Sequence, residues 1–122
     1  MATKYHVLLL EHNSITNRIE FKFPETQKKV VGYKFNLDLR NLHEKPDNFP
    51  SVDIAKIVVL NKDGDVCIDD ILNYNMCKRE GFIETDIDLN LNKNFYINSS
   101  LTQNIGVEGS ESIFLKATFK TI

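Results

Sequence analysis

Several residue types that mark specialised proteins are scarce in this chain of 122 residues. It contains no tryptophan, three prolines and two cysteines, and the apolar run nearest its N-terminus, Val7–Leu10, is only four residues long. A membrane-spanning helix needs about 20 apolar residues, and a secretory signal peptide needs an apolar core of about 7–15. We expect neither, and therefore a protein of the cytoplasm or of a virion. Cys67 and Cys77 form no metal-ligand pattern, which favours free thiols.

Charged and catalytic residue types are present but form no pattern. The 15 lysines and arginines against 17 aspartates and glutamates leave a net charge of −2, and the basic residues are scattered, which argues against nucleic acid as a partner. Five glycines supply no phosphate-binding loop, and no Gly-x-Ser-x-Gly motif occurs. His6, His12 and His43 have no spacing that would bind zinc or activate a nucleophile. We predict no catalytic residue, no metal site, no cofactor and no enzymatic activity.

The sequence is rich in apolar residues that alternate with polar ones. Successive side chains of a strand point to opposite sides of the sheet, so this alternation predicts strands with one buried face. Segments 15–23, 83–91 and 113–120 follow the pattern. The clearest case is 31–40, whose predicted buried face consists of Val31, Tyr33, Phe35, Leu37 and Leu39.

The remaining segments complete about eight strands. Segments 4–11 and 52–60 are more continuously apolar, which favours a central position in a sheet, and a short helix is the alternative for 52–60. Segments 65–69 and 94–101 are also predicted strands, with 104–108 as a short addition. At most one short helix is expected, near 69–80 and capped by Asp69. The longest loop is predicted at 41–51, and the Asp63–Gly64 pair predicts a hairpin turn.

Short strands at a spacing of roughly ten residues, without regularly alternating helices, are typical of antiparallel folds. We predict a single all-β domain over residues 1–122, built as a two-sheet sandwich of the jelly-roll or immunoglobulin-like type. The cysteine–tryptophan–cysteine core of antibody domains is absent.

Two groups of acidic residues could carry chemistry. The segment Asn61–Asp70 resembles the start of an EF-hand calcium loop, but Val66 stands where the glycine is needed and Leu72 where the bidentate glutamate is needed. A β-hairpin turn explains the same residues. Two carboxylate pairs, Asp86 with Asp88 and Asp69 with Asp70, are candidates for an acid/base dyad. Asp86 and Asp88 share the polar face of a predicted strand, where a solvated surface is the expected interpretation.

Four aromatic residues fall outside the predicted buried faces. Phe82 and Phe114 stand on nominally polar faces, where we expect the second sheet to cover them, with a contact surface as the alternative. Tyr74 and Tyr96 are the candidates for a carbohydrate-binding platform.

The absence of site chemistry favours a non-enzymatic structural or assembly module that binds other protein chains, as a homo-oligomer or in a larger assembly. Asparagine, isoleucine and lysine, which A/T-rich codons encode, are abundant at 13, 12 and 12 residues. This bias indicates an A/T-rich genome, as in many bacteria and many viruses, and fits a virion accessory protein, such as a capsid decoration, spike or tail component. The alternatives are a module that binds carbohydrate or another cell-surface ligand, and a calcium-dependent binding domain.

Overall fold

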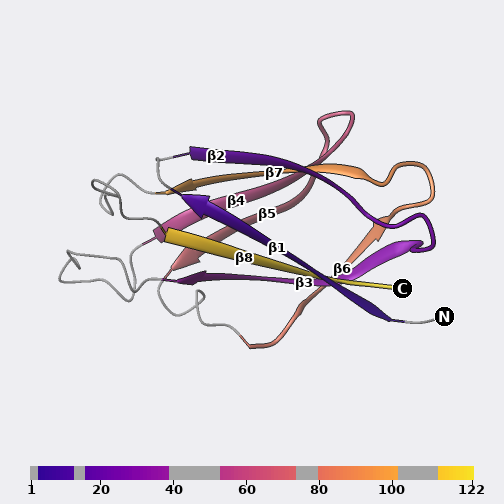
Figure 1. Ribbon diagram of the computed structural model, residues 1–122, viewed down its shortest axis with the longest axis horizontal. Coiled ribbons are helices and arrows are strands. Elements are labelled where there is room, and N and C mark those ends of the chain that lie inside the picture. The colour runs from indigo at the N-terminus through magenta and orange to yellow at the C-terminus, as the bar shows by residue number, and fades with distance from the viewer. Residues whose placement is uncertain (1–2, 13–15, 39–52, 74–79, 102–112) are drawn as a thin grey trace.

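The computed structural model describes residues 3–12, 16–38, 53–73, 80–101 and 113–122. Within these ranges the chain forms eight β-strands and no helix (Figure 1), which confirms the all-β prediction. The strands are β1 (Lys4–His12), β2 (Thr16–Lys22), β3 (Lys29–Asp38), β4 (Asp53–Asn61), β5 (Val66–Asn73), β6 (Ile83–Asp88), β7 (Asn94–Leu101) and β8 (Ile113–Thr121).

The strands build two antiparallel sheets of four, in the orders β1-β8-β3-β6 and β2-β7-β4-β5. Their pairings are nested, because β1 pairs with β8, β2 with β7, β3 with β6 and β4 with β5. Consecutive nested pairs lie in alternate sheets, which is the winding of the eight-stranded jelly roll. In an immunoglobulin-like sandwich the first strand pairs with the second. Of the two predicted sandwich types, the structure therefore has the jelly roll.

The hydrophobic core lies between the two sheets. Along β4 and β8, every second side chain points inward and is buried, as the two-residue period of a strand requires. Phe35, Phe95 and Phe119 are the largest fully buried side chains. The buried cluster consists of Leu10, Phe23, Val30, Phe35, Leu37, Ala55, Ile57, Val59, Ile68, Leu72, Leu89, Phe95, Ile97, Leu115, Ala117 and Phe119.

Strand β3 departs from its predicted face at one end. The prediction placed Val31 in the core, but Val30 is the buried residue and Val31 is half-buried, because the register shifts between Val30 and Gly32. An extra residue in one strand reverses which face its neighbours occupy. Beyond this bulge, Phe35 and Leu37 are buried as predicted.

Strand β6 is shorter than the predicted segment 83–91, and it ends at Asp88. The Asp88 carboxylate accepts a hydrogen bond from the backbone N–H of Asn90 at 2.8 Å, which turns the chain. Leu89 remains in the core, whereas Leu91, predicted to face inward, is 95% exposed.

The predicted short helix near 69–80 is wrong over the part that the structure describes, because residues 69–73 belong to strand β5. Asp69 is an exposed strand residue and caps no helix. Segment 52–60 is likewise a strand, β4, which lies between β7 and β5 in the central position predicted for it.

Strand β1 contradicts its predicted position. Its continuous apolar sequence favoured the middle of a sheet, but β1 is an edge strand that pairs only with β8 among the described strands. No third sheet of described strands covers its outer face, which carries the exposed apolar residues Tyr5, Val7 and Leu9.

The predicted hairpin between β4 and β5 is confirmed. Gly64 has a φ of 88°, a value that side-chain-bearing residues rarely adopt. The backbone N–H of Asn61 donates to the carbonyl of Asp65 at 2.9 Å, and the N–H of Gly64 donates to the carbonyl of Asn61 at 3.0 Å. The predicted loop 41–51, the strand 104–108 and Leu39, His43, Tyr74 and Cys77 lie outside the described residues.

Candidate functional site

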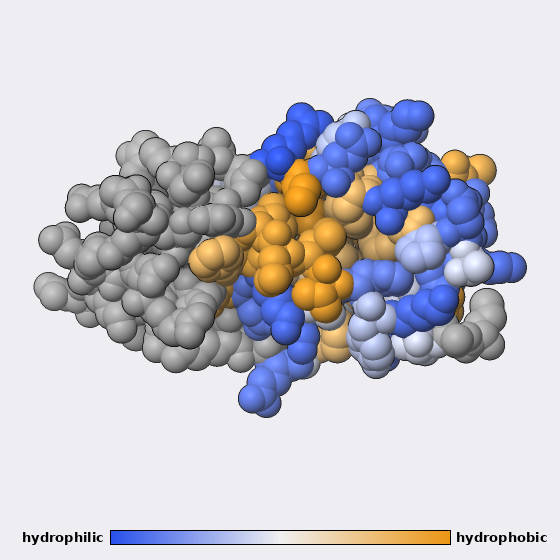
Figure 2. Space-filling view, in the orientation of Figure 1, coloured by the Kyte–Doolittle hydropathy of each residue, from blue (hydrophilic) through white to orange (hydrophobic). Residues whose placement is uncertain are grey.

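The outer face of β1 is the most apolar exposed surface on the described strands. Tyr5, Val7 and Leu9 point away from the core and are 59%, 51% and 66% exposed, whereas Leu10 on the inner face is buried. On the neighbouring strand β8, Phe114 also points outward and is 40% exposed. We call Tyr5, Val7, Leu9 and Phe114 the β1 surface. A hydrophobic area lies in the middle of the face seen in Figure 2, over the front strands β1 and β8 of Figure 1.

Phe82 and Phe114 are not covered by the second sheet, contrary to the prediction. Phe114 lies on the outer face of β8, and the ring of Phe82 packs against Tyr5 on the same outer side, with 5.7 Å between ring centroids. The ammonium group of Lys34 lies 4.9 Å from the centre of the Phe82 ring and donates to the carbonyl of Glu80 at 3.3 Å. These contacts leave Phe82 half-buried and extend the apolar area towards β3 and β6.

Thr118 occupies the centre of this outer face, opposite Val7 on β1 and Lys34 on β3. It is 5% exposed although its strand position was predicted to be polar and solvated. Its hydroxyl has no hydrogen-bond partner among the described groups. A buried hydroxyl without a partner is unusual in native proteins.

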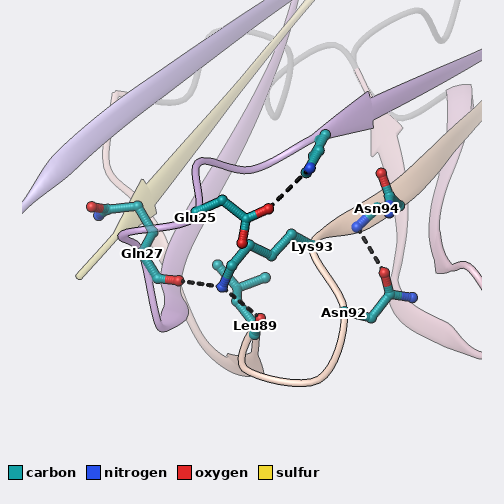
Figure 3. Close-up of polar contacts among 7 residues, drawn as sticks. Glu25, Gln27, Leu89, Asn92, Lys93 and Asn94 are labelled. Atoms are coloured by element: carbon teal, nitrogen blue, oxygen red, sulfur yellow. Dashed lines mark hydrogen bonds and ion pairs between the residues drawn. The ribbon is translucent and has the colours of Figure 1, made fainter.

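A polar cleft of about 460 Å³ opens at the end of the sandwich where the turn 23–28, the β4–β5 hairpin and the segment 89–93 meet. Lys93 fixes this end, because its ammonium group donates to the carbonyls of Gln27 at 3.0 Å and Leu89 at 2.9 Å (Figure 3). Lys22 forms an ion pair of 3.0 Å with Glu25 and lowers the pKa of that carboxyl. The cleft is lined by Lys22, Glu25, Lys62, Asp63, Asn90, Leu91, Asn92, Lys93 and Asn94.

A second cleft, also about 460 Å³, brings together the two acidic groups singled out in the sequence. Asp63 and Asp65 of the hairpin line it with Asp86 and Asp88 of β6. The side-chain oxygen of Asn61, which would be the first ligand of a calcium loop, instead accepts the backbone N–H groups of Asp63 at 3.0 Å and Asp65 at 2.9 Å. Within the described ranges, no group of three histidine, cysteine or acidic residues is arranged to hold a metal ion.

The two carboxylate pairs considered as acid/base dyads, Asp86 with Asp88 and Asp69 with Asp70, lie on strands β6 and β5. Asp86 is exposed and lies 3.4 Å from the ammonium group of Lys29. Asp69 and Asp70 are successive residues of β5 and so point to opposite sides of the sheet. The described geometry brings neither pair into a shared enclosed site.

His6 belongs to a partly buried hydrogen-bond network. Its Nε2 lies 2.9 Å from the hydroxyl of Thr121, which also accepts a hydrogen bond from the amide of Gln27 at 2.6 Å. Burial, with a smaller contribution from Lys4, lowers the pKa of His6. The network joins β1, the turn before β3 and the last strand.

Cys67 lies in strand β5, as predicted, and is half-buried. Burial raises the pKa of its thiol, and the thiol lies 3.7 Å from the carbonyl of Asp65. A thiol whose pKa is raised is a poor nucleophile at neutral pH.

The eight-stranded winding places this chain in the structural class of jelly-roll β-sandwich proteins. No protein-family model matches the sequence, and no curated protein matches it significantly. No described segment forms a helix long and apolar enough to cross a membrane.

Proposed function

We propose that this chain is a non-enzymatic assembly module that binds other protein chains through the β1 surface. The observation that supports this proposal is the exposure of Tyr5, Val7 and Leu9 at three successive outward positions of one edge strand. Phe114 on β8 is opposite Glu11 and so lies diagonally next to Leu9. Isolated apolar residues are normal on protein surfaces, but a contiguous group of them marks an interaction site.

The sequence pattern supports the same interpretation. Continuous apolar runs are typical of strands that are covered on both faces. In this chain the inner face of β1 contacts the core, and the outer face is left open. A partner chain that covered the outer face would bury about 300 Å² of apolar side-chain surface. At about 25 cal/mol per Å², this burial favours association by several kcal/mol, before the entropic cost of binding is subtracted.

Site-specific photo-cross-linking tests the proposal. A photoreactive amino acid replaces Leu9 in one variant and Ile71, an exposed apolar residue on the edge strand of the other sheet, in the control. Irradiation in the cells or particles that contain the protein should give discrete cross-linked protein adducts from position 9 and not from position 71. Equal labelling from both positions, or none from position 9, would contradict the proposal.

Within this class we propose a virion accessory role, as a capsid decoration, spike or tail component. The support is an analogy, since jelly rolls are common among viral capsid domains, and a fold alone does not define a function. The A/T-codon bias of the composition is consistent with it. Co-sedimentation with assembled particles tests this role, and a protein that stays in the supernatant at every particle concentration would argue against it.

The two alternative functions gain no support from the described residues. The guanidinium of Arg18 lies 4.3 Å from the centre of the Tyr96 ring, so one face of the expected carbohydrate platform is already occupied. The first expected calcium ligand, Asn61, is engaged by the backbone of its own turn.

A further inference from the structure

We infer that the partner of β1 is a second copy of this chain, and this inference rests on the proposed assembly function. The two copies pair through the edge of β1 that no described strand occupies, antiparallel, about a two-fold axis at Val7. The result is one continuous sheet of eight strands across two chains. Pairing of this kind satisfies the backbone N–H and C=O groups that an edge strand leaves open.

The first argument is the contrast between β1 and the other edge strands of the same protein. Edge strands are commonly protected from pairing by charged side chains. Three of the four edges follow this rule. Their charged residues are Arg18, Glu20 and Lys22 on β2, Asp69 and Asp70 on β5, and Glu84, Asp86 and Asp88 on β6.

Strand β1 has no such protection along its centre. Between Lys4 and Glu11 its sequence is Tyr-His-Val-Leu-Leu-Leu, and the one side chain there that can carry a positive charge, His6, has a lowered pKa and faces inward. The one long edge without a central charge is therefore also the edge with the exposed apolar face.

The second argument is that the β1 surface complements itself. A two-fold axis at Val7 places Val7 opposite Val7 of the second copy, and Tyr5 opposite Leu9 in both halves. Directly opposed residues of an antiparallel pair point to the same face, and aromatic–aliphatic pairs of this kind stabilise sheets. The like-charged Lys4 side chains of the two copies lie at opposite ends of the pair, so they do not oppose each other.

The size of the contact sets the expected strength. In this edge-to-edge pair the outward ends of Tyr5, Val7 and Leu9 stay in solvent, and only their flanks that face the second copy are buried. The apolar area buried per copy is therefore smaller than the roughly 200–250 Å² that these side chains expose, and one pair of edge backbones adds to it. The total falls below the roughly 1,200 Å² that separates standard interfaces from weak ones. A concentration-dependent dimer is therefore expected rather than a permanent one.

Sedimentation equilibrium of the purified full chain tests the inference. The average mass should rise from 14.1 kDa towards twice that value as the concentration increases. Val7→Lys places two lysines against each other at the axis and should weaken the dimer at least about tenfold. The matched control, Ile71→Lys, makes the same change at a residue of similar exposure on β5 and should leave the dimer intact. Thermal melts confirm that both variants remain folded.

Two further variants test the axis itself. Val7→Glu alone should also be monomeric, whereas an equimolar mixture of Val7→Lys and Val7→Glu should form a heterodimer. The double variant Tyr5→Lys/Leu9→Glu, which places lysine opposite glutamate twice, should dimerise better than either single variant. A dimer that survives Val7→Lys, or a mixture that stays monomeric, would overturn the pairing.

The outcomes separate self-pairing from the broader function. A wild-type chain that remains monomeric at about 1 mM, where even weak complexes are populated, overturns self-pairing. In that case, cross-links from position 9 to a different protein would still support the assembly function. Absence of those cross-links would remove the assembly function as well.

Discussion

Two threonines on strand β8 provide a matched test of how buried hydroxyls contribute to stability here. Thr118 and Thr121 are 5% and 0% exposed and lie on opposite faces of the same strand. The Thr121 hydroxyl contacts His6 and accepts from Gln27, whereas the Thr118 hydroxyl has no partner among the described groups. Replacing each threonine by valine keeps the side-chain shape and exchanges the hydroxyl for a methyl group.

The two substitutions should have opposite effects on the free energy of unfolding. An unsatisfied buried polar group costs about 1–3 kcal/mol, so Thr118→Val should stabilise the protein by about 1 kcal/mol. Thr121→Val leaves the amide of Gln27, which is 3% exposed, without its acceptor and should destabilise the protein by about 2 kcal/mol. In a domain of this size, 1 kcal/mol corresponds to about 4 °C in melting temperature.

Urea unfolding followed by circular dichroism measures both changes, with thermal melts as an independent check. The measurements are made on dilute protein, because self-association would add to the apparent stability. If Thr118→Val lowered the stability as much as Thr121→Val, the outward hydroxyl would have an energetic partner, and the assignment of the two threonines would be refuted.

Three further predictions concern His6, Gly64 and Lys93. The lowered pKa of His6 means that the unfolded chain binds a proton before the folded chain does, so stability should fall as the pH drops below about 6.5. His6→Gln should remove this part of the pH dependence, and urea titrations that show the same slope in both proteins would contradict it. Gly64→Ala should lower the free energy of unfolding by about 1 kcal/mol, because Gly64 has a positive φ. Gly81→Ala is the control, since an added Cβ has open space at both glycines, and it should leave the free energy of unfolding nearly unchanged. Lys93→Met removes two hydrogen bonds to backbone carbonyls and should lower the free energy of unfolding by about 2 kcal/mol. An unchanged urea midpoint would show that these two hydrogen bonds contribute little to stability.

The sequence predicted the strands well where one face is buried and the other is solvated. β6 alternates half-buried and exposed side chains without a break over Ile83–Asp88. The bulge in β3 was not predictable, because Val30 and Val31 are both apolar and period-two alternation cannot tell which of them is the extra residue. The second half of strand β5 was concealed by two successive aspartates, Asp69 and Asp70, which broke the apolar alternation and suggested a helix start.

The candidate surface was harder to predict than the fold. The apolar run of β1 indicated coverage on both faces, and only the arrangement in two sheets shows that no described strand covers its outer face. The same arrangement leaves Phe114, which alternates with the buried Leu115, without a further sheet over it. The arrangement of the sheets depends on which strands pair across long sequence separations, and a local sequence pattern carries no information about that pairing.

The pairing of β1 with β8 joins residues that are more than 100 positions apart, such as Lys4 with Thr121. On a ribosome, β1 emerges long before β8 has been synthesised, so its apolar side chains stay unpaired until residues 113–121 have been made. Folds dominated by such distant contacts form slowly and expose their strands meanwhile. Premature termination before residue 113 would remove the strand that lies between β1 and β3, leaving nascent chains that depend on chaperones or aggregate.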